Sequence, residues 1–148
     1  MTFEEYKQFI EETYEECDVL HANKDHTKKN CGNTSNRVAP KGITWIDYWR
    51  AMTENHSNTM CCSSCGKEIF VGKPTEEQKK RFAKGDDRVE KHRAQGGHVW
   101  VEAPDDKDCK GGRYITPLCP ECNGQHDQHI LIKKGSVYCK ELGAITNE

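Results

Sequence analysis

The sequence contains no long apolar run, and its hydrophobic content is low. Only 34% of the 148 residues are hydrophobic, whereas 31% are charged. No segment comes near the ~20 apolar residues that a transmembrane helix needs, so we expect no membrane association. A chain of this length predicts one domain with a small supply of apolar side chains. A structural metal, which can contribute on the order of 10 kcal/mol to folding, would offset this shortage.

The chain also lacks an overall positive charge. Its formal net charge is -2, which argues against non-specific attraction to nucleic acid. The charge is unevenly distributed, because residues 1–20 hold one lysine and seven acids, whereas residues 21–50 hold six basic and two acidic residues. A local basic surface for nucleic acid therefore stays open as an interpretation.

The first residues are acidic and amphipathic, which is not the pattern of a secretory signal. We therefore expect a cytoplasmic protein. Its nine cysteines, an odd number, would then be reduced and either free or bound to metal. Disulfides and a redox-active dithiol remain alternatives.

Two Cys-x-x-Cys pairs, Cys62–Cys65 and Cys119–Cys122, form the most informative motif. Two such pairs predict a tetrahedral zinc site with four thiolate ligands at about 2.3 Å. Because 53 residues separate the pairs, the intervening chain must fold back on itself. Cys61 could replace Cys62 as a ligand, but the two-residue gap favours Cys62.

A second set of potential ligands precedes these pairs in a polar stretch. Its members are Cys17, His21, His26 and Cys31. Their spacing allows a second zinc site, although four such residues in a polar loop need not bind a metal. The absence of periodicity predicts a loop over residues 21–42.

Helical periodicity predicts an amphipathic helix over residues 2–20 and a second helix over residues 44–54. Thr2 with Glu5 forms a capping box, and Thr44 is an N-cap. The two helices are expected to pack through Phe9, Tyr14, Trp45 and Trp49. For the aromatic rings within residues 44–52, stacking on nucleic-acid bases is the alternative.

The remaining elements surround the second cysteine pair. A polar, exposed insertion with a short helix at 74–85 is expected between the pairs. Strands are predicted at residues 96–101 and 114–118, followed by a helix from Cys119 to about residue 128. Residues 129–139 have the pattern of a closing β-hairpin.

This order of elements resembles the zinc-containing HNH, or ββα-metal, endonuclease family, which is built on a treble clef. The residues that carry the resemblance are Cys62, Cys65, Gly97-His98-Val99 and Pro117-Leu118-Cys119-Pro120-Glu121-Cys122-Asn123. It covers about residues 61–130, with an insertion at 67–95. It implies an α+β fold with a zinc treble-clef ββα core in residues 61–148. An N-terminal helical layer in residues 1–60 and a C-terminal β-hairpin would complete this fold.

In this family the histidine at the end of the first strand is the general base, and His98 matches it. Asn123 matches the residue that holds a catalytic divalent ion such as Mg²⁺ or Mn²⁺, while the zinc is structural. The sequence departs from the family at two positions. Gly97 stands where a metal ligand is common, and Tyr114 stands where an asparagine is expected. His126 is the best candidate to supply the missing ligand, ahead of Glu102, Asp127 and His129.

Two functions follow from the resemblance. The first is a divalent-metal-dependent endonuclease that hydrolyses nucleic acid phosphodiesters, with DNA favoured over RNA. The alternative is a catalytically inactive treble-clef zinc module that binds a protein or nucleic acid, as an adaptor or inhibitor. The missing ligand at Gly97 favours the alternative, whereas His98 together with Asn123 favours the nuclease.

Overall fold

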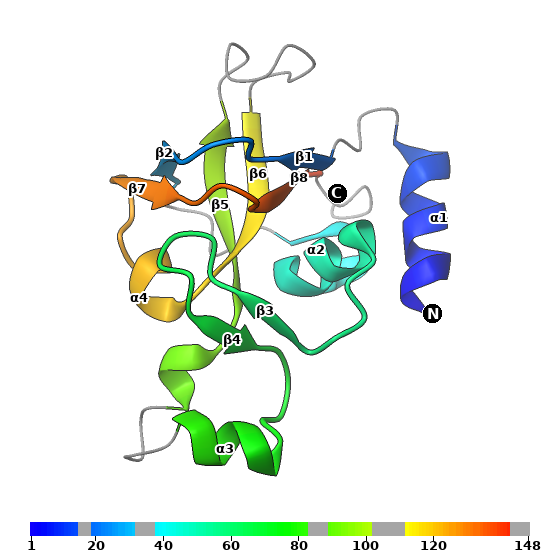
Figure 1. Ribbon diagram of the computed structural model, residues 1–148. Coiled ribbons are helices and arrows are strands. Elements are labelled where there is room, and N and C mark those ends of the chain that lie inside the picture. Colours follow the sequence, from blue (N-terminus) through cyan, green and yellow to red (C-terminus); the bar gives the residue numbers. More distant parts are fainter. Residues whose placement is uncertain (15–18, 32–37, 83–88, 102–111, 143–148) are drawn as a thin grey trace.

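The computed structural model describes residues 1–14, 19–31, 38–82, 89–101 and 112–142 (Figure 1). Within these residues the chain forms four α-helices, a six-stranded antiparallel sheet and a separate two-stranded sheet. The large sheet has the strand order β1-β8-β6-β5-β2-β7. The predicted α+β class is confirmed. None of the helices in the described segments has the length and apolar character that crossing a bilayer requires.

One long antiparallel ribbon contributes four of these strands. They are β1 (Val19–His21), β2 (His26–Asn30), β7 (His129–Ile132) and β8 (Val137–Lys140). Val19 pairs with Cys139, and Lys29 pairs with His129. A step of ten positions along the first side of the ribbon therefore corresponds to a step of ten positions along the second. The register is therefore the same in both halves of the ribbon. Between the halves, the Ala22 N–H donates to the Ser136 carbonyl over 2.8 Å.

The ribbon closes onto the hairpin formed by β5 (Gln95–Val101) and β6 (Gly112–Leu118). Strand β8 pairs with β6, and β2 pairs with β5. The hydrogen-bonded strands thus form a ring, and in Figure 1 the ribbon crosses in front of the upright hairpin. Alternate residues of each strand point into this ring. The buried side chains gathered there include Val99, Val101, Tyr114, Ile130, Ile132 and Tyr138.

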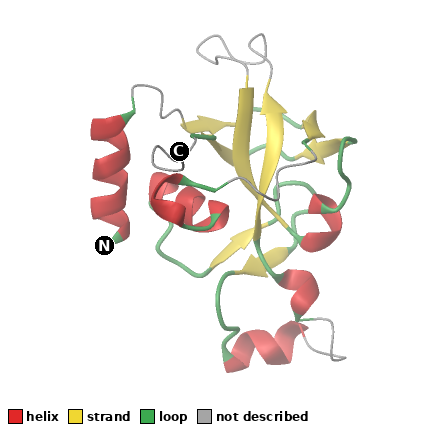
Figure 2. Cartoon of the chain, turned by 180° about the vertical axis from the view of Figure 1, so that it is seen from behind, coloured by secondary structure: helices red, strands yellow, loops and turns green. Residues whose placement is uncertain are grey.

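Helix α2 (Trp45–Thr53) covers the opposite face of the β5–β6 hairpin, and α1 (Phe3–Thr13) packs against α2, as Figure 2 shows. The predicted caps are present, because Thr2 and Glu5 form a capping box and Thr44 accepts from the Asp47 N–H. The predicted packing of the two helices is confirmed. Their shared cluster contains Trp45 and Trp49, with Phe9 and Tyr14 packed against it.

The predicted exposed insertion has a small core of its own. It contains β4 (Glu68–Phe70), which pairs with β3 (Thr59–Cys61), then α3 (Glu76–Phe82) and a 3₁₀ turn at Glu90–His92. Phe82 lies between Phe70 and His92, and its ring stacks on the His92 ring at a centroid distance of 3.9 Å. The prediction of a solvated excursion is therefore wrong for this aromatic stack.

Four other predictions of local structure are wrong. The first helix ends at Thr13 instead of reaching residue 20, and residues 19–21 form a strand. Residues 26–30 are strand β2 inside a region predicted to be a loop. The helix α4 (Pro120–Asn123) is one turn long and does not extend to residue 128. Residues 129–139 do not form a hairpin, because β7 and β8 pair with the earlier strands and not with each other.

Candidate metal centre

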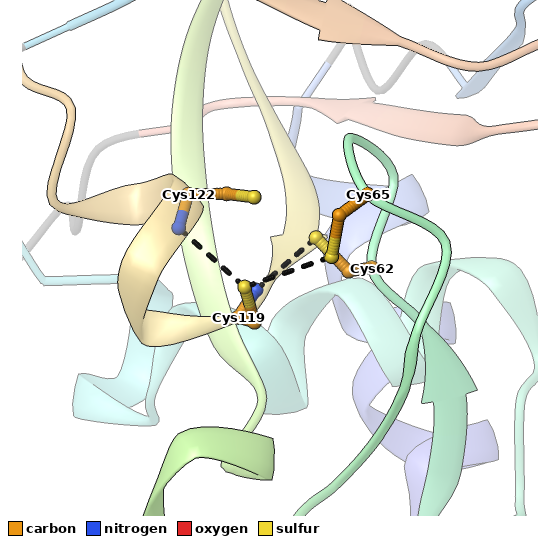
Figure 3. Close-up of side chains that lie close together, drawn as sticks. All are labelled: Cys62, Cys65, Cys119 and Cys122. Carbon is orange, nitrogen blue, oxygen red and sulfur yellow. Dashed lines mark hydrogen bonds between the residues drawn. The ribbon is translucent and has the colours of Figure 1, made fainter.

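The first cysteine pair occupies the turn between β3 and β4. The Cys62 N–H donates to the Lys67 carbonyl, and the Gly66 N–H donates to the Cys62 carbonyl over 2.9 Å. Gly66 has φ of 83°, a left-handed conformation that glycine adopts without strain. This tight turn directs the Cys62 and Cys65 side chains toward the same point (Figure 3).

The second pair lies at the start of α4. Cys119 is the N-cap, and its sulfur accepts the backbone N–H of Cys122 at 3.4 Å. Pro120 follows as the first helical residue, where its missing N–H leaves no donor unpaired. The backbone N–H of Cys119 donates to the Cys62 sulfur at 3.3 Å, so the two pairs are joined directly.

The four sulfur atoms of Cys62, Cys65, Cys119 and Cys122 lie within 4.8 Å of one another. Cys65 and Cys119 approach to 3.9 Å between their sulfurs. Four sulfurs that surround Zn²⁺ at about 2.3 Å would stand about 3.8 Å apart. The donor set therefore fits zinc with little movement. Cys61 ends β3, is exposed and does not belong to the cluster, so the choice of Cys62 agrees with the geometry.

The surroundings of these thiols also fit a cation. Burial opposes ionisation of Cys62, but backbone N–H groups, those of Cys119 and Cys65 first, outweigh it and hold the Cys62 pKa below its usual value. Burial raises the pKa of Cys119 and of Cys122, and the neighbouring thiols add to this effect. Four thiolates cannot form here together unless a positive ion compensates their charge. Zn²⁺ supplies that charge and prefers sulfur ligands.

Hydrogen bonds fasten the first cysteine turn to the large sheet. The Ser63 hydroxyl bonds the Thr116 hydroxyl at 2.6 Å, and the Ser63 N–H donates to the Pro117 carbonyl. The Lys133 N–H donates to the Ser63 carbonyl over 2.8 Å. The cluster thus connects β3–β4, the β5–β6 hairpin, α4 and the ribbon.

His98 lies on the face of β5 that α2 covers. It is 5% exposed, and its ring meets the Trp45 ring edge-on at a centroid distance of 5.3 Å. Its Nδ1 atom bonds the carboxylate of Glu141, whose side chain is also buried. Glu141 was not expected from the sequence, because it follows the segment predicted to close the fold.

Asn123 lies on the other face of β5, beside Gly97. Its Oδ1 atom is 3.2 Å from the position that a Cβ atom on Gly97 would occupy, and its Nδ2 donates to Gln95 Oε1 over 2.8 Å. His126 is exposed beyond α4, as are Asp127 and His129. The structure thus brings Asn123 to Gly97, while the His98 ring points to the opposite face.

The other candidates are dispersed. Tyr114 is fully buried inside the ring, and Glu102 lies outside the described residues. Cys17, from the second potential ligand set, also lies outside them. In the parts of the chain that the structure describes, the one metal-type cluster is that of the four cysteines.

Asn30 is a structural residue that the sequence pattern concealed. It is 1% exposed, and its Nδ2 atom lies 3.0 Å from the carbonyl oxygens of both Asn123 and Gln125. It thereby ties β2 to the end of α4 and gives the Asn123 carbonyl a donor that the helix itself does not supply. An inward-pointing asparagine in a polar stretch carries no signal of a strand, so the sequence predicts a loop at this position.

These observations define the class of protein: an α+β scaffold that carries a candidate four-cysteine metal centre. Comparison with protein-family models, with curated proteins and with solved structures gives no match for this chain.

Proposed function

We propose that this chain is an HNH-like treble-clef zinc module that binds nucleic acid without cleaving it. The observation that carries the proposal is the convergence of four cysteine sulfurs from a β-turn and the start of a helix. Their order along the chain, on either side of the β5–β6 hairpin, is the order that the resemblance requires. A zinc ion held there would have four protein ligands and no open position, which is typical of a structural site.

The surroundings of His98 favour binding over catalysis. A general base must come within hydrogen-bond reach of the water that it activates. His98 is 5% exposed, and α2 covers its face of β5. Gly97 has no side chain to offer a second metal, and the Asn123 amide already bonds Gln95.

One observation favours the endonuclease as a second candidate. The Glu141 carboxylate holds Nδ1 of His98, which leaves Nε2 as the proton acceptor of an oriented imidazole. In this reading Asn123 and His126 would hold a Mg²⁺ or Mn²⁺ ion, whose chemistry is stabilisation of charge on the phosphate. A shift of α2 would be needed to expose His98, and β5 would also have to rearrange, because Asn123 lies on the other face of that strand.

Cleavage and binding can be separated in one set of measurements. Wild-type protein is tested for plasmid nicking with Mg²⁺ and Mn²⁺, and for binding of labelled DNA and RNA by fluorescence anisotropy. We expect binding without nicking. His98→Gln retains a partner for Glu141 and serves as the test variant, with the exposed His56→Gln as its matched control.

Nicking by wild type and His56→Gln but not by His98→Gln would establish the endonuclease instead. Absence of both nicking and binding, in protein that contains zinc and is folded, would refute both nucleic-acid functions. A protein partner, as adaptor or inhibitor target, would then be the remaining interpretation.

A further inference from the structure

A row of four side chains crosses the outer surface of the large sheet. The strand register places Arg113 opposite Trp100, Trp100 opposite Lys29, and Lys29 opposite His129. All four residues are exposed, and each adjoins a strand neighbour that points into the buried core. Directly paired residues on one face of a sheet lie about 5 Å apart, so these side chains are contiguous. We call this set the Trp100 row.

The row lies where the helical layer ends. Two positions earlier along β5 is His98, whose ring α2 covers through Trp45. Trp100 is 43% exposed, whereas Trp45 and Trp49 are 8% and 6% exposed. An indole left open on a sheet, away from the core that holds both other tryptophans, indicates a contact surface.

The chemistry of the row is basic and aromatic. Lysine and arginine flank the indole directly, and the row contains no carboxylate. Among the described residues, neither Lys29 nor His129 has a carboxylate partner. This positive charge is local, because the whole chain has a net charge of -2. Such a surface is complementary to a polyanion that also carries exposed planar rings able to stack on the indole.

We propose that the Trp100 row binds single-stranded nucleic acid, with one base stacked on the Trp100 indole and the flanking phosphates bound by Lys29 and Arg113. This inference rests on the nucleic-acid binding proposed above. Stacking on an exposed ring requires an unpaired base, whose face a duplex does not offer. Three inter-strand spacings of about 4.8 Å make the row about 14 Å long, which suits a segment of a few nucleotides.

The test compares affinities of zinc-loaded protein for a labelled 12-nucleotide single strand and for the matching duplex. We expect wild type to prefer the single strand and Trp100→Ala to bind it about tenfold more weakly, because one stacking contact is lost. Trp100→Phe should recover most of the affinity. Lys29→Ala should lower the slope of log affinity against log salt by about 0.7, the value for one phosphate contact on a single strand.

Leu131→Ala is the matched control, because Leu131 is 42% exposed on the same face but cannot stack on a base. Its affinity should equal that of wild type. If Trp100→Ala binds the single strand as tightly as wild type does, the proposed role of the Trp100 row is wrong, while the proposed function stands. Preference for the duplex would overturn the single-strand specificity. Failure of wild type to bind either form would refute the proposed function and the row together.

Discussion

The two faces of the β5–β6 hairpin are stabilised in different ways. The helical face is packed with aromatic rings whose polar atoms are paired, since Trp49 Nε1 donates to the Val137 carbonyl over 2.8 Å and Tyr48 Oη bonds Lys140. The cysteine side brings four thiols together instead, with raised pKa values at Cys119 and Cys122. The helical face is thus held by packing and hydrogen bonds, whereas the cysteine side presents a donor set that fits an ion.

The largest effect should come from removing the proposed zinc ion or one of the four cysteines. We expect Cys119→Ser to lose zinc and to unfold or aggregate, because a structural zinc contributes on the order of 10 kcal/mol to a domain whose total stability is about 5–15 kcal/mol. Zinc content per chain and thermal unfolding, with and without a chelator, measure this. The neighbouring Cys61→Ser should keep about one zinc per chain. A Cys119→Ser variant as stable as wild type would show that the cluster is not structural.

The second effect tests the helical face. Trp49→Ala removes a 6%-exposed indole and should lower the free energy of unfolding by about 3–5 kcal/mol. Urea denaturation measures this change. The folded fraction should retain its zinc, because Trp49 does not belong to the cysteine cluster. Loss of zinc from folded Trp49→Ala would show that the two faces are coupled.

A smaller effect is expected at the link between the ring and α4. Asn30→Ala leaves the Asn123 carbonyl without its donor, whereas the Gln125 carbonyl keeps the Gln128 N–H, and the variant should destabilise the fold by about 1–3 kcal/mol. It should also weaken zinc binding, since Asn123 follows Cys122 directly. Thermal melting and zinc competition with a chelator report the two quantities. The exposed Thr27→Ala in the same strand is the control and should change neither.

The smallest effect belongs to the N-terminal cap. Thr2 and Glu5 bond each other's backbone N–H groups, at 3.1 Å and 2.9 Å. Thr2→Ala should cost about 1 kcal/mol and should increase hydrogen exchange in the first turn of α1 only. Faster hydrogen exchange at the cysteine cluster in Thr2→Ala would contradict the independence of the helical face and the cysteine side.

Elements with local signals could be predicted from the sequence. The caps at Thr2 and Thr44, the aromatic spacing of α2 and the two cysteine pairs all depend on residues within one turn of each other. The strands at 96–101 and 114–118 were also recognisable, since apolar residues are dense there. These signals were enough to predict the class of the fold and the residues of the cluster.

The ribbon could not be predicted because its partners are distant and its inward residues are polar. In β2 the buried positions are Lys28 and Asn30, so the apolar alternation that marks a strand is missing. Lys133 to Ser136 form a turn, which suggested a local hairpin, yet the chain continues along the same partner beyond it. The contact between His98 and Glu141 joins residues that no local pattern relates.

Closure of the ribbon also determines when this protein can complete its folding. Val19 pairs with Cys139, 120 residues later, and Lys29 pairs with His129, 100 residues later. Contacts between residues so far apart in sequence form slowly, because the entropy of closing the loop is lost before the contacts stabilise the fold. During synthesis the β1–β2 segment is made long before its partner, and unpaired strand edges invite aggregation. Lysines at positions 28 and 29 give this early segment the charge that discourages pairing with other chains until β7 and β8 emerge.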